Sequence, residues 1–306
     1  MLVIIYLLIP SLTFSTYSII AWDGEEMGVA VQSHWFSVGS VVGWAESGVG
    51  VVATQSFANP AYGYASLELL RKGFVADDVL KALLSIDEQR EVRQVAILDK
   101  FGNVSVFTGK NCIKYAGDLK GENFSVQANL ILKEGVPKAM AKAFLEKKGK
   151  LAERMIQALK AGEEAGGDLR GKQSAYIKVV KVKSTGNPYK DISIELRVED
   201  SGEPLIELER LYKIHQAYSF MDKGDEALGL KDIKKAIEYY SKATEFYKND
   251  EILFWQGLSF YIAGEKEEGK KILKALLRDE LPWKELLKRL VPQGMIKKED
   301  LEFLLK

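Results

Sequence analysis

The order of strand-like and helix-like segments between residues 16 and 198 constrains the fold more than any other feature of the chain. Strands and helices occur here in groups, whereas a repeating βαβ unit needs single strands that alternate with single helices. The grouping indicates an α+β protein with antiparallel or mixed sheets. Strands are expected at residues 16–22, 27–32, 48–55, 92–99, 103–108, 124–129, 174–182 and 191–199, and helices at 61–73, 76–85, 138–147 and 151–161.

The last of these expected strands has the clearest pattern. Its apolar residues alternate strictly with polar ones, which is typical of a strand with one buried face. The apolar positions are Ile192, Ile194, Leu196 and Val198, and the polar ones are Ser193, Glu195 and Arg197.

After Pro204 the pattern becomes entirely helical, with apolar residues at a period near 3.6. Ala236 and Tyr240 have the small-then-aromatic spacing of a second tetratricopeptide helix, and Trp255 and Leu258 follow the first-helix pattern. This tail resembles one to two such repeats, whereas about three are needed for independent stability. A helical hairpin docked on the preceding domain is the alternative. We expect domains at residues 16–222 and 223–306.

The charge balance and the scarcity of histidine exclude several classes of function. Lys and Arg number 43, as do Asp and Glu, so no overall field attracts nucleic acid or anionic lipid. With only His34 and His215, neither a multi-histidine metal site nor a Ser-His-Asp triad is expected. We expect no cofactor, no metal and no nucleic-acid partner. The single cysteine, Cys112, cannot form an intrachain disulfide.

Residues 2–9 form an uninterrupted apolar run. The run is much shorter than the about 20 residues that span a bilayer, and it has the length of a signal-peptide core. The small residues Thr13 and Ser15 lie just before Thr16, although no Lys or Arg precedes the run. Residues 1–15 are interpreted as the signal peptide of a secreted or cell-surface protein. The alternatives are a mis-assigned start codon, which would leave the protein cytoplasmic, and a buried strand.

Cleavage after Ser15 would make Thr16 the first residue of the mature chain. Thr16 would then carry both a hydroxyl and a free α-amine, whose ordinary pKa of about 7.7–8.0 leaves a useful neutral fraction near pH 7. The amine can accept the hydroxyl proton, so one residue supplies nucleophile and base without a histidine. The alternative is that Thr16 merely begins a strand.

Several motifs follow one another along the chain: TYSIIA at 16–21, GVAVQS at 28–33, FSVGSVV at 36–42, GVGVVATQ at 48–55, ANPAYG at 58–63, RQVA at 93–96, GGDLRGKQSA at 166–175 and EPLIEL at 203–208. They resemble a bacterial and archaeal family, domain of unknown function 1028, which is placed in the N-terminal-nucleophile (Ntn) hydrolase-like superfamily. The resemblance runs from residue 16 to about residue 215 and does not cover the tail. It implies a four-layer αββα sandwich, in which the first mature residue, here Thr16, attacks an amide carbonyl.

The glycine-rich loop at residues 166–174 is a candidate substrate site, because glycine lets the backbone approach a ligand closely. Arg170 offers a planar fork for a carboxylate, and Asp168 could hold an ammonium group, as related amidases of the superfamily do with amino-acid-like substrates. Gln173, in the same loop, is a further candidate. Alternatively, Asp168 and Arg170 pair with each other and brace the loop.

A tetrahedral oxyanion needs preorganised hydrogen-bond donors. Asn129, Thr54 and Gln55 are the candidates, and Asn59 lies close to the last two in sequence. Each is equally explained as a strand-end cap or an Asx turn. Ser33 and His34 end an expected strand in the region that faces the first residue in such folds. Together with Asn59 they are candidate substrate-binding residues, although His34 can also be an ordinary surface histidine.

From the resemblance and the cleavage site ahead of Thr16, we expect an Ntn-type amidohydrolase that cleaves a peptide or another amide through an ester on Thr16. The substrate is not assigned. The alternative is a secreted binding or adaptor protein that uses the sandwich as scaffold and the helical tail to bind a peptide or protein. A structural partner of a secreted hydrolase is a third interpretation. Homo-oligomerisation is compatible with all three.

Overall fold

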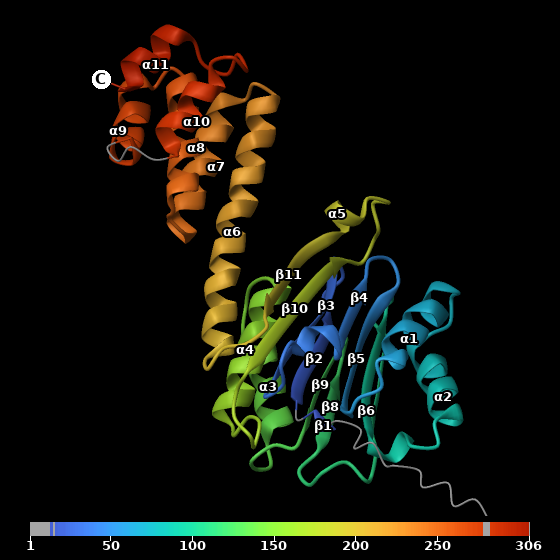
Figure 1. Ribbon diagram of the computed structural model, residues 1–306. Helices are drawn as coiled ribbons and strands as arrows, with labels where there is room; N and C mark the ends of the chain where they lie inside the picture. Colours follow the sequence, from blue (N-terminus) through green and yellow to red (C-terminus); the bar gives the residue numbers. More distant parts are fainter. Residues whose placement is uncertain (1–12, 15, 278–281, 306) are drawn as a thin grey trace, which may run out of the picture. The chain divides into compact units, whose positions relative to one another are not determined.

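The computed structural model describes residues 13–14, 16–277 and 282–305 (Figure 1). The signal peptide expected at residues 1–15 lies almost entirely outside these residues. Two compact units divide at Glu209–Arg210, within helix α6 (Pro204–Gly229), rather than at residue 222. The division is earlier because Ala217 and Met221 already pack among side chains of the following helices.

Two antiparallel sheets form the frame of the N-terminal unit. The first sheet has the order β1-β5-β6-β7, with β4 also on β5, and the second has the order β11-β10-β3-β2-β9-β8. The first sheet contains β1 (Thr13–Phe14), β4 (Gly43–Glu46), β5 (Gly50–Phe57), β6 (Arg93–Asp99) and β7 (Val104–Thr108). The second contains β2 (Thr16–Trp22), β3 (Glu26–Ser33), β8 (Gly117–Gly121), β9 (Phe124–Asn129), β10 (Ser174–Lys181) and β11 (Ile192–Val198).

The two sheets bury a shared apolar core between their inner faces. Side chains of a strand alternate between the two faces of its sheet, so every second residue of the central strands enters this core. Val29 and Val31 of β3 pack there with Val51 of β5, Leu98 of β6 and Tyr176 of β10. The alternation predicted for β11 is confirmed from Ile194 onward, with Ile194 and Val198 buried and Glu195 and Arg197 exposed, whereas Ile192 at the start of the strand is exposed.

Helices cover the outer face of each sheet (Figure 1). Helices α1 (Ala61–Arg71) and α2 (Ala76–Ile86) pack Leu67 and Leu80 on the first sheet. Helices α3 (Val136–Glu146) and α4 (Leu151–Glu164) cover the second, where the rings of Phe124 and Phe144 lie 4.9 Å apart. The α+β class with antiparallel sheets is therefore confirmed. Strands β4 and β8 and the short helix α5 (Pro188–Asp191) were not expected from the sequence.

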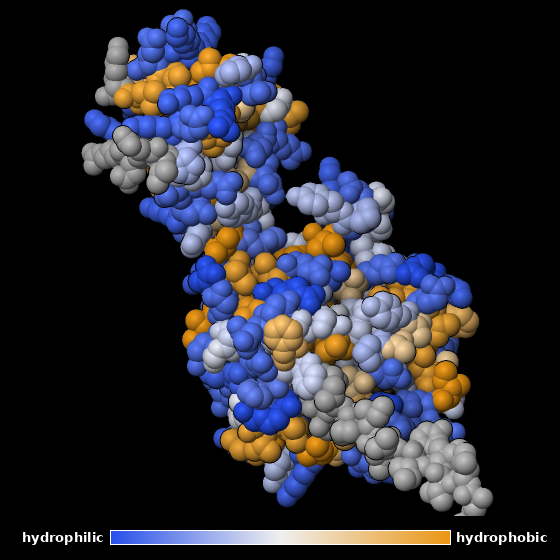
Figure 2. Space-filling model, in the orientation of Figure 1, coloured by the Kyte–Doolittle hydropathy of each residue, from blue (hydrophilic) through white to orange (hydrophobic). Residues whose placement is uncertain are grey.

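The C-terminal unit is helical, as expected. At two places within it, a glycine of one helix lies against a large side chain of the next helix. Gly224 of α6 lies against the Tyr240 ring of α7, and Gly257 of α8 lies against Leu273 of α9. Hydrophilic residues dominate the side of this unit seen in Figure 2, with apolar residues visible between them. Its remaining helices are α7 (Ile233–Phe246), α8 (Asp250–Ile262), α9 (Lys266–Leu276), α10 (Trp283–Leu290) and α11 (Lys298–Leu305).

Candidate functional site

Thr16 is the first residue of β2, a central strand of the second sheet. It pairs with Ser33 of β3 on one side and with Asn129 of β9 on the other. Thr16 is completely buried, and its hydroxyl donates to Ser33 Oγ at 3.2 Å. By the alternation of β2, its side chain faces the first sheet, as Ile20 does in the apolar core. The structure thus brings Thr16 and Ser33 together.

Two side-chain amides converge on the backbone of Thr16. Gln55 Nε2, from the first sheet, donates to the Thr16 carbonyl oxygen at 3.2 Å, and Asn129 Nδ2 donates to the same oxygen at 3.3 Å. Both amides were oxyanion candidates, and both lie beside the candidate nucleophile. In this structure they are directed at the carbonyl of Thr16 itself, so they hold the residue in place.

Gln94 of β6 connects these two amides and was not singled out from the sequence. Its Oε1 accepts from Gln55 Nε2 at 2.7 Å and from Asn129 Nδ2 at 3.1 Å. Its Nε2 donates to three oxygens, so reversing the amide would place N–H groups against N–H groups. The orientation of Gln94 is therefore fixed by its surroundings. The three acceptors are Thr108 Oγ1 at 2.9 Å, the Gly117 carbonyl at 3.1 Å and the Ala128 carbonyl at 3.0 Å.

The polar cluster continues between the sheets from Gln55 toward β9. Ser18 Oγ donates to Gln55 Oε1 at 2.6 Å and accepts from Gln127 Nε2 at 2.7 Å. Ser125 Oγ donates to Gln127 Oε1 at 3.0 Å. We call Thr16, Ser18, Ser33, Gln55, Gln94, Ser125, Gln127 and Asn129 the inter-sheet polar cluster. None of these eight side chains ionises near neutral pH, so an α-amine at Thr16 would be the one base supplied by the cluster residues.

Thr54 and Asn59 do not join this cluster. Thr54 precedes Gln55 in β5 and so faces the other side of the sheet, toward helices α1 and α2, as its neighbour Val52 does. Asn59 Oδ1 accepts from the backbone N–H of Ala61 at 3.1 Å, which is the Asx-turn alternative realised at the start of α1.

Asp168 and Arg170 pair with each other, as the bracing alternative states. Arg170 Nη2 lies 3.1 Å from Asp168 Oδ2, and the Arg170 backbone N–H donates to Asp168 Oδ1 at 2.9 Å. The Asp168 side chain is completely buried and also accepts from the His34 backbone N–H at 2.8 Å. Asp168 therefore ties the glycine-rich loop to the end of β3, next to Ser33. The Arg170 side chain keeps 30% exposure.

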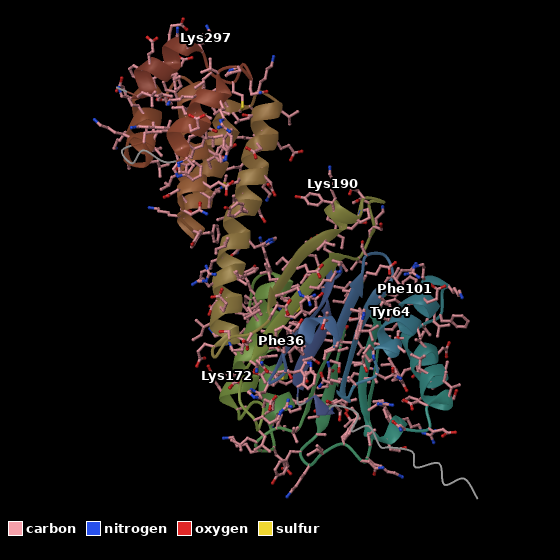
Figure 3. The ribbon with its side chains drawn as sticks, viewed as in Figure 1. Phe36, Tyr64, Phe101, Lys172, Lys190 and Lys297 are labelled. Carbon is pink, nitrogen blue, oxygen red and sulfur yellow. The ribbon has the colours of Figure 1, made fainter. Side chains whose placement is uncertain are left out.

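Gln173 contacts the site through its backbone. Its N–H donates to the Ser33 carbonyl at 3.1 Å, while its side chain reaches Asp200 at the surface. Phe36 and Lys172, labelled in Figure 3, mark the loops that follow β3 and precede β10 at this end of the sheet. Phe36 is 62% exposed, and Lys172 pairs with Glu203 at 2.6 Å.

Tyr17 lies on the opposite face of β2 from Thr16, beneath α4. Its hydroxyl donates to Glu163 Oε2 at 2.5 Å. Burial, and then the adjacent Glu163 carboxylate, raise the pKa of Tyr17 well above its ordinary value. Tyr17 is therefore neutral at physiological pH and fixes β2 from behind.

Ser56 adopts a left-handed backbone with a φ of 70°, immediately after Gln55. A non-glycine residue at such a φ is strained and is often found at functional sites. The chain ahead of Thr16 meets this point, because Phe14 of β1 pairs with Ser56.

Nearby, Cys112 Sγ contacts the Arg93 carbonyl at 3.4 Å, and burial raises the pKa of this thiol, which disfavours the reactive thiolate.

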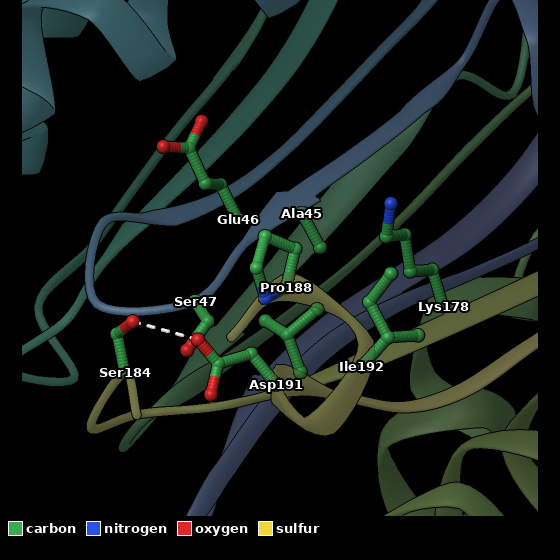
Figure 4. Close-up of a pocket in the computed structure, with 9 residues that line it drawn as sticks. Ala45, Glu46, Ser47, Lys178, Ser184, Pro188, Asp191 and Ile192 are labelled. Atoms are coloured by element: carbon green, nitrogen blue, oxygen red, sulfur yellow. Dashed lines mark hydrogen bonds between the residues drawn. The ribbon is translucent and has the colours of Figure 1, made fainter. Parts of the chain in front are cut away.

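A separate cavity of about 240 Å³ lies near the other end of β10 (Figure 4). Ser174 pairs with Ser33 beside Thr16, whereas Lys181, after the cavity residues Lys178 and Val180, pairs with Glu26. The charged groups of this cavity already have partners. Asp191 accepts from Ser184 Oγ at 2.6 Å, and Lys178 pairs with Glu195 at 3.2 Å.

Within the described part of the chain, no three His, Cys, Asp or Glu side chains gather as metal ligands would. No helix of residues 13–14, 16–277 and 282–305 is long and apolar enough to cross a membrane.

The fold and the site define an α+β protein with two antiparallel sheets and a buried polar cluster around the first residue of β2. The chain belongs to the family of unknown function DUF1028, which it matches over residues 16–208. It is similar to protein SPO2555 from Silicibacter pomeroyi, a DUF1028 protein of known crystal structure, with a TM-score of 0.59 and 29% sequence identity. The similarity covers 65% of this chain and 85% of that chain. No curated protein matches it.

Proposed function

We propose that this protein is an N-terminal-nucleophile amidohydrolase whose nucleophile is Thr16, exposed by removal of residues 1–15 on export. The observation that carries the proposal is the position of Thr16. Within the buried polar cluster, its hydroxyl donates to Ser33 of the neighbouring strand β3. Its carbonyl accepts hydrogen bonds from Gln55 and Asn129. The order helix, sheet, sheet, helix supports the assignment to the Ntn hydrolase-like superfamily (Figure 1).

The reaction follows from the two groups that a terminal Thr16 carries. The α-amine accepts the hydroxyl proton while Oγ attacks the substrate carbonyl. The amide C–N bond breaks, its nitrogen leaves with that proton, and the acyl group remains as an ester on Thr16. Water then attacks the ester with the same amine as base, which releases a carboxylic acid and restores the hydroxyl.

The neighbours of Thr16 have positioning roles in this mechanism. Gln55 and Asn129 hold the Thr16 carbonyl, and Gln94 orients both of them. Ser33, 3.2 Å from the hydroxyl, fixes the rotamer that aims Oγ. Holding a nucleophile in one orientation lowers the entropic part of the barrier.

The test combines N-terminal sequencing of the exported protein with labelling by a β-lactone, whose carbonyl captures an activated hydroxyl. We expect a chain that begins at Thr16 and a label on that residue. Thr16→Ala should abolish labelling and amide hydrolysis, while Ser40→Ala, which removes an exposed hydroxyl elsewhere, should change neither. A mature chain that starts at another residue, or hydrolysis that survives Thr16→Ala, would refute the proposal.

A second proposal concerns the C-terminal unit, which we interpret as tetratricopeptide-like. The contacts Gly224–Tyr240 and Gly257–Leu273 join residues at the same separation, and the second pair follows the first by 33 positions. A repeat of about 34 residues is typical of this class. The repetition supports an adaptor role for the tail, which could operate with or without a hydrolase. Co-purification of a partner with the processed protein, residues 16–306, but not with its Gly257→Leu variant would test it.

A further inference from the structure

The segment just before Thr16 lies on the opposite sheet from Thr16 itself. Strand β1 pairs antiparallel with β5, with Thr13 opposite Phe57 and Phe14 opposite Ser56. Thr16 then begins β2 in the second sheet. The chain therefore changes from one sheet to the other at the position where the proposed function requires cleavage.

Strand β1 occupies one particular edge of β5. All of strand β6 pairs with the other edge of β5, from Gly50 to Ser56. On the edge that β1 uses, β4 covers only Gly50–Ala53. Removal of residues 1–15 takes β1 away from the backbone at Ser56 and Phe57. This edge contains the strained Ser56 and ends at Phe57, whose carbonyl accepts from Arg93 Nη1 of β6 at 2.6 Å.

We infer that the acyl portion of the substrate is an extended peptide, which pairs with this edge of β5 in place of β1. The inference rests on the proposed function. In the uncleaved chain the acyl group on the Thr16 nitrogen is the leader, whose residues Thr13 and Phe14 pair with β5. In the acyl-enzyme the acyl group is on Thr16 Oγ, only two carbons from that nitrogen. An acyl chain on Oγ therefore starts from nearly the same point and meets the same edge.

Pairing of this kind selects a class of substrate. Main-chain hydrogen bonds to a sheet edge supply affinity with little dependence on side chains, and they need a peptide several residues long. The geometry points to peptidyl amides, cleaved at the carbonyl of their last residue, in preference to amides with a short acyl group.

The experiment compares two fluorogenic amides with one leaving amine, using the processed protein that begins at Thr16. One is acetyl-Ser amide, and the other carries the leader sequence Ser-Leu-Thr-Phe-Ser of residues 11–15 as its acyl group. We expect at least tenfold higher kcat/KM for the longer amide, mainly through KM. Two further versions are N-methylated singly at the positions of Thr13 and Phe14. Since neighbouring residues of a strand direct their N–H groups to opposite sides, one of the two should lose the gain.

Each outcome separates the inference from the function on which it rests. Equal kcat/KM for the short and long amides, with no effect of either methyl group, overturns the inference and leaves Thr16 as nucleophile. A processed protein that cleaves neither amide and takes no β-lactone label at Thr16 overturns the proposed function. A chain that retains residues 1–15 overturns both, and its intact mass shows this before any substrate is added.

Discussion

The side-chain oxygen of Gln94 in the first sheet accepts a hydrogen bond from Asn129 Nδ2 in the second, at 3.1 Å. The same oxygen accepts from Gln55, so one buried atom orients both amides that hold Thr16. The polar cluster is therefore a structural link between the sheets as well as the surroundings of the candidate nucleophile.

Gln94→Leu should destabilise the protein by about 2–4 kcal/mol, because two buried amides lose their shared acceptor and three acceptors lose their donor. The matched control is Gln173→Leu, whose side chain bonds Asp200 at the surface and whose loss should cost less than about 0.5 kcal/mol. Urea unfolding of both variants measures the difference. Equal effects would show that the cluster contributes little to holding the sheets together.

Asp168→Asn should cost more stability than Arg170→Ala. The Asp168 carboxylate is completely buried and accepts from the backbone of His34 and Arg170 as well as from the guanidinium. Its replacement breaks a loop anchor at a cost of about 3 kcal/mol, whereas the partly exposed guanidinium contributes about 1 kcal/mol or less. Thermal unfolding compares the two variants. If Arg170→Ala leaves stability unchanged but raises KM for amides with a free carboxylate, the substrate-binding alternative for Arg170 is supported instead.

Tyr17 should make the protein sensitive to base. Burial and the Glu163 carboxylate raise the Tyr17 pKa in the folded chain, whereas the unfolded chain has the ordinary value of about 10. The resulting stability is fully present below pH of about 10 and is lost as pH rises toward the folded pKa. Tyr17→Phe should be less stable at pH 7, because Glu163 loses its donor, and should lose less stability between pH 9 and about 11. Urea midpoints across this range measure both slopes, and parallel slopes would contradict the assignment.

Gly257→Ala should destabilise the helical unit, although alanine favours helix formation by about 1 kcal/mol. The added Cβ would lie 2.8 Å from Leu273 Cγ and 3.1 Å from the Gly269 carbonyl oxygen. Gly229→Ala is the control, since a Cβ there meets nothing within 4 Å and should be neutral or stabilising. Circular dichroism during urea unfolding reports on both variants. A stabilised Gly257→Ala protein would mean that α8 and α9 can separate without cost.

Much of the fold was predictable because its patterns are local. The alternation from 194 to 198 and the two neighbouring strands expected at 92–99 and 103–108 agree with the structure, since each is an apolar pattern bounded by turn residues. Strand β8 could not be found this way. It has Leu119 as its one apolar residue between two glycines, and its conformation is set by pairing with β9.

The candidate site was predictable only in part. Period two places Gln55 and Thr54 on opposite faces of β5, so this distinction was available from the sequence once the strand was recognised. Gln94 offered a weaker signal, a polar residue directly before the apolar run of β6. Its role depends on Thr108, Asn129 and Gln55 meeting around one amide, and that meeting is a product of the tertiary fold.

The strand order of the second sheet has a consequence for biosynthesis. Its first-made strands, β2 and β3, lie in the middle, and their neighbours β9 and β10 follow only at Phe124–Asn129 and Ser174–Lys181. During most of the synthesis of this unit, the nascent chain therefore carries two apolar strands, β2 and β3, whose outer edges have no neighbouring strand to pair with. Such segments are prone to associate with other chains. We therefore expect the growing polypeptide to be most prone to aggregation until β10 has been translated.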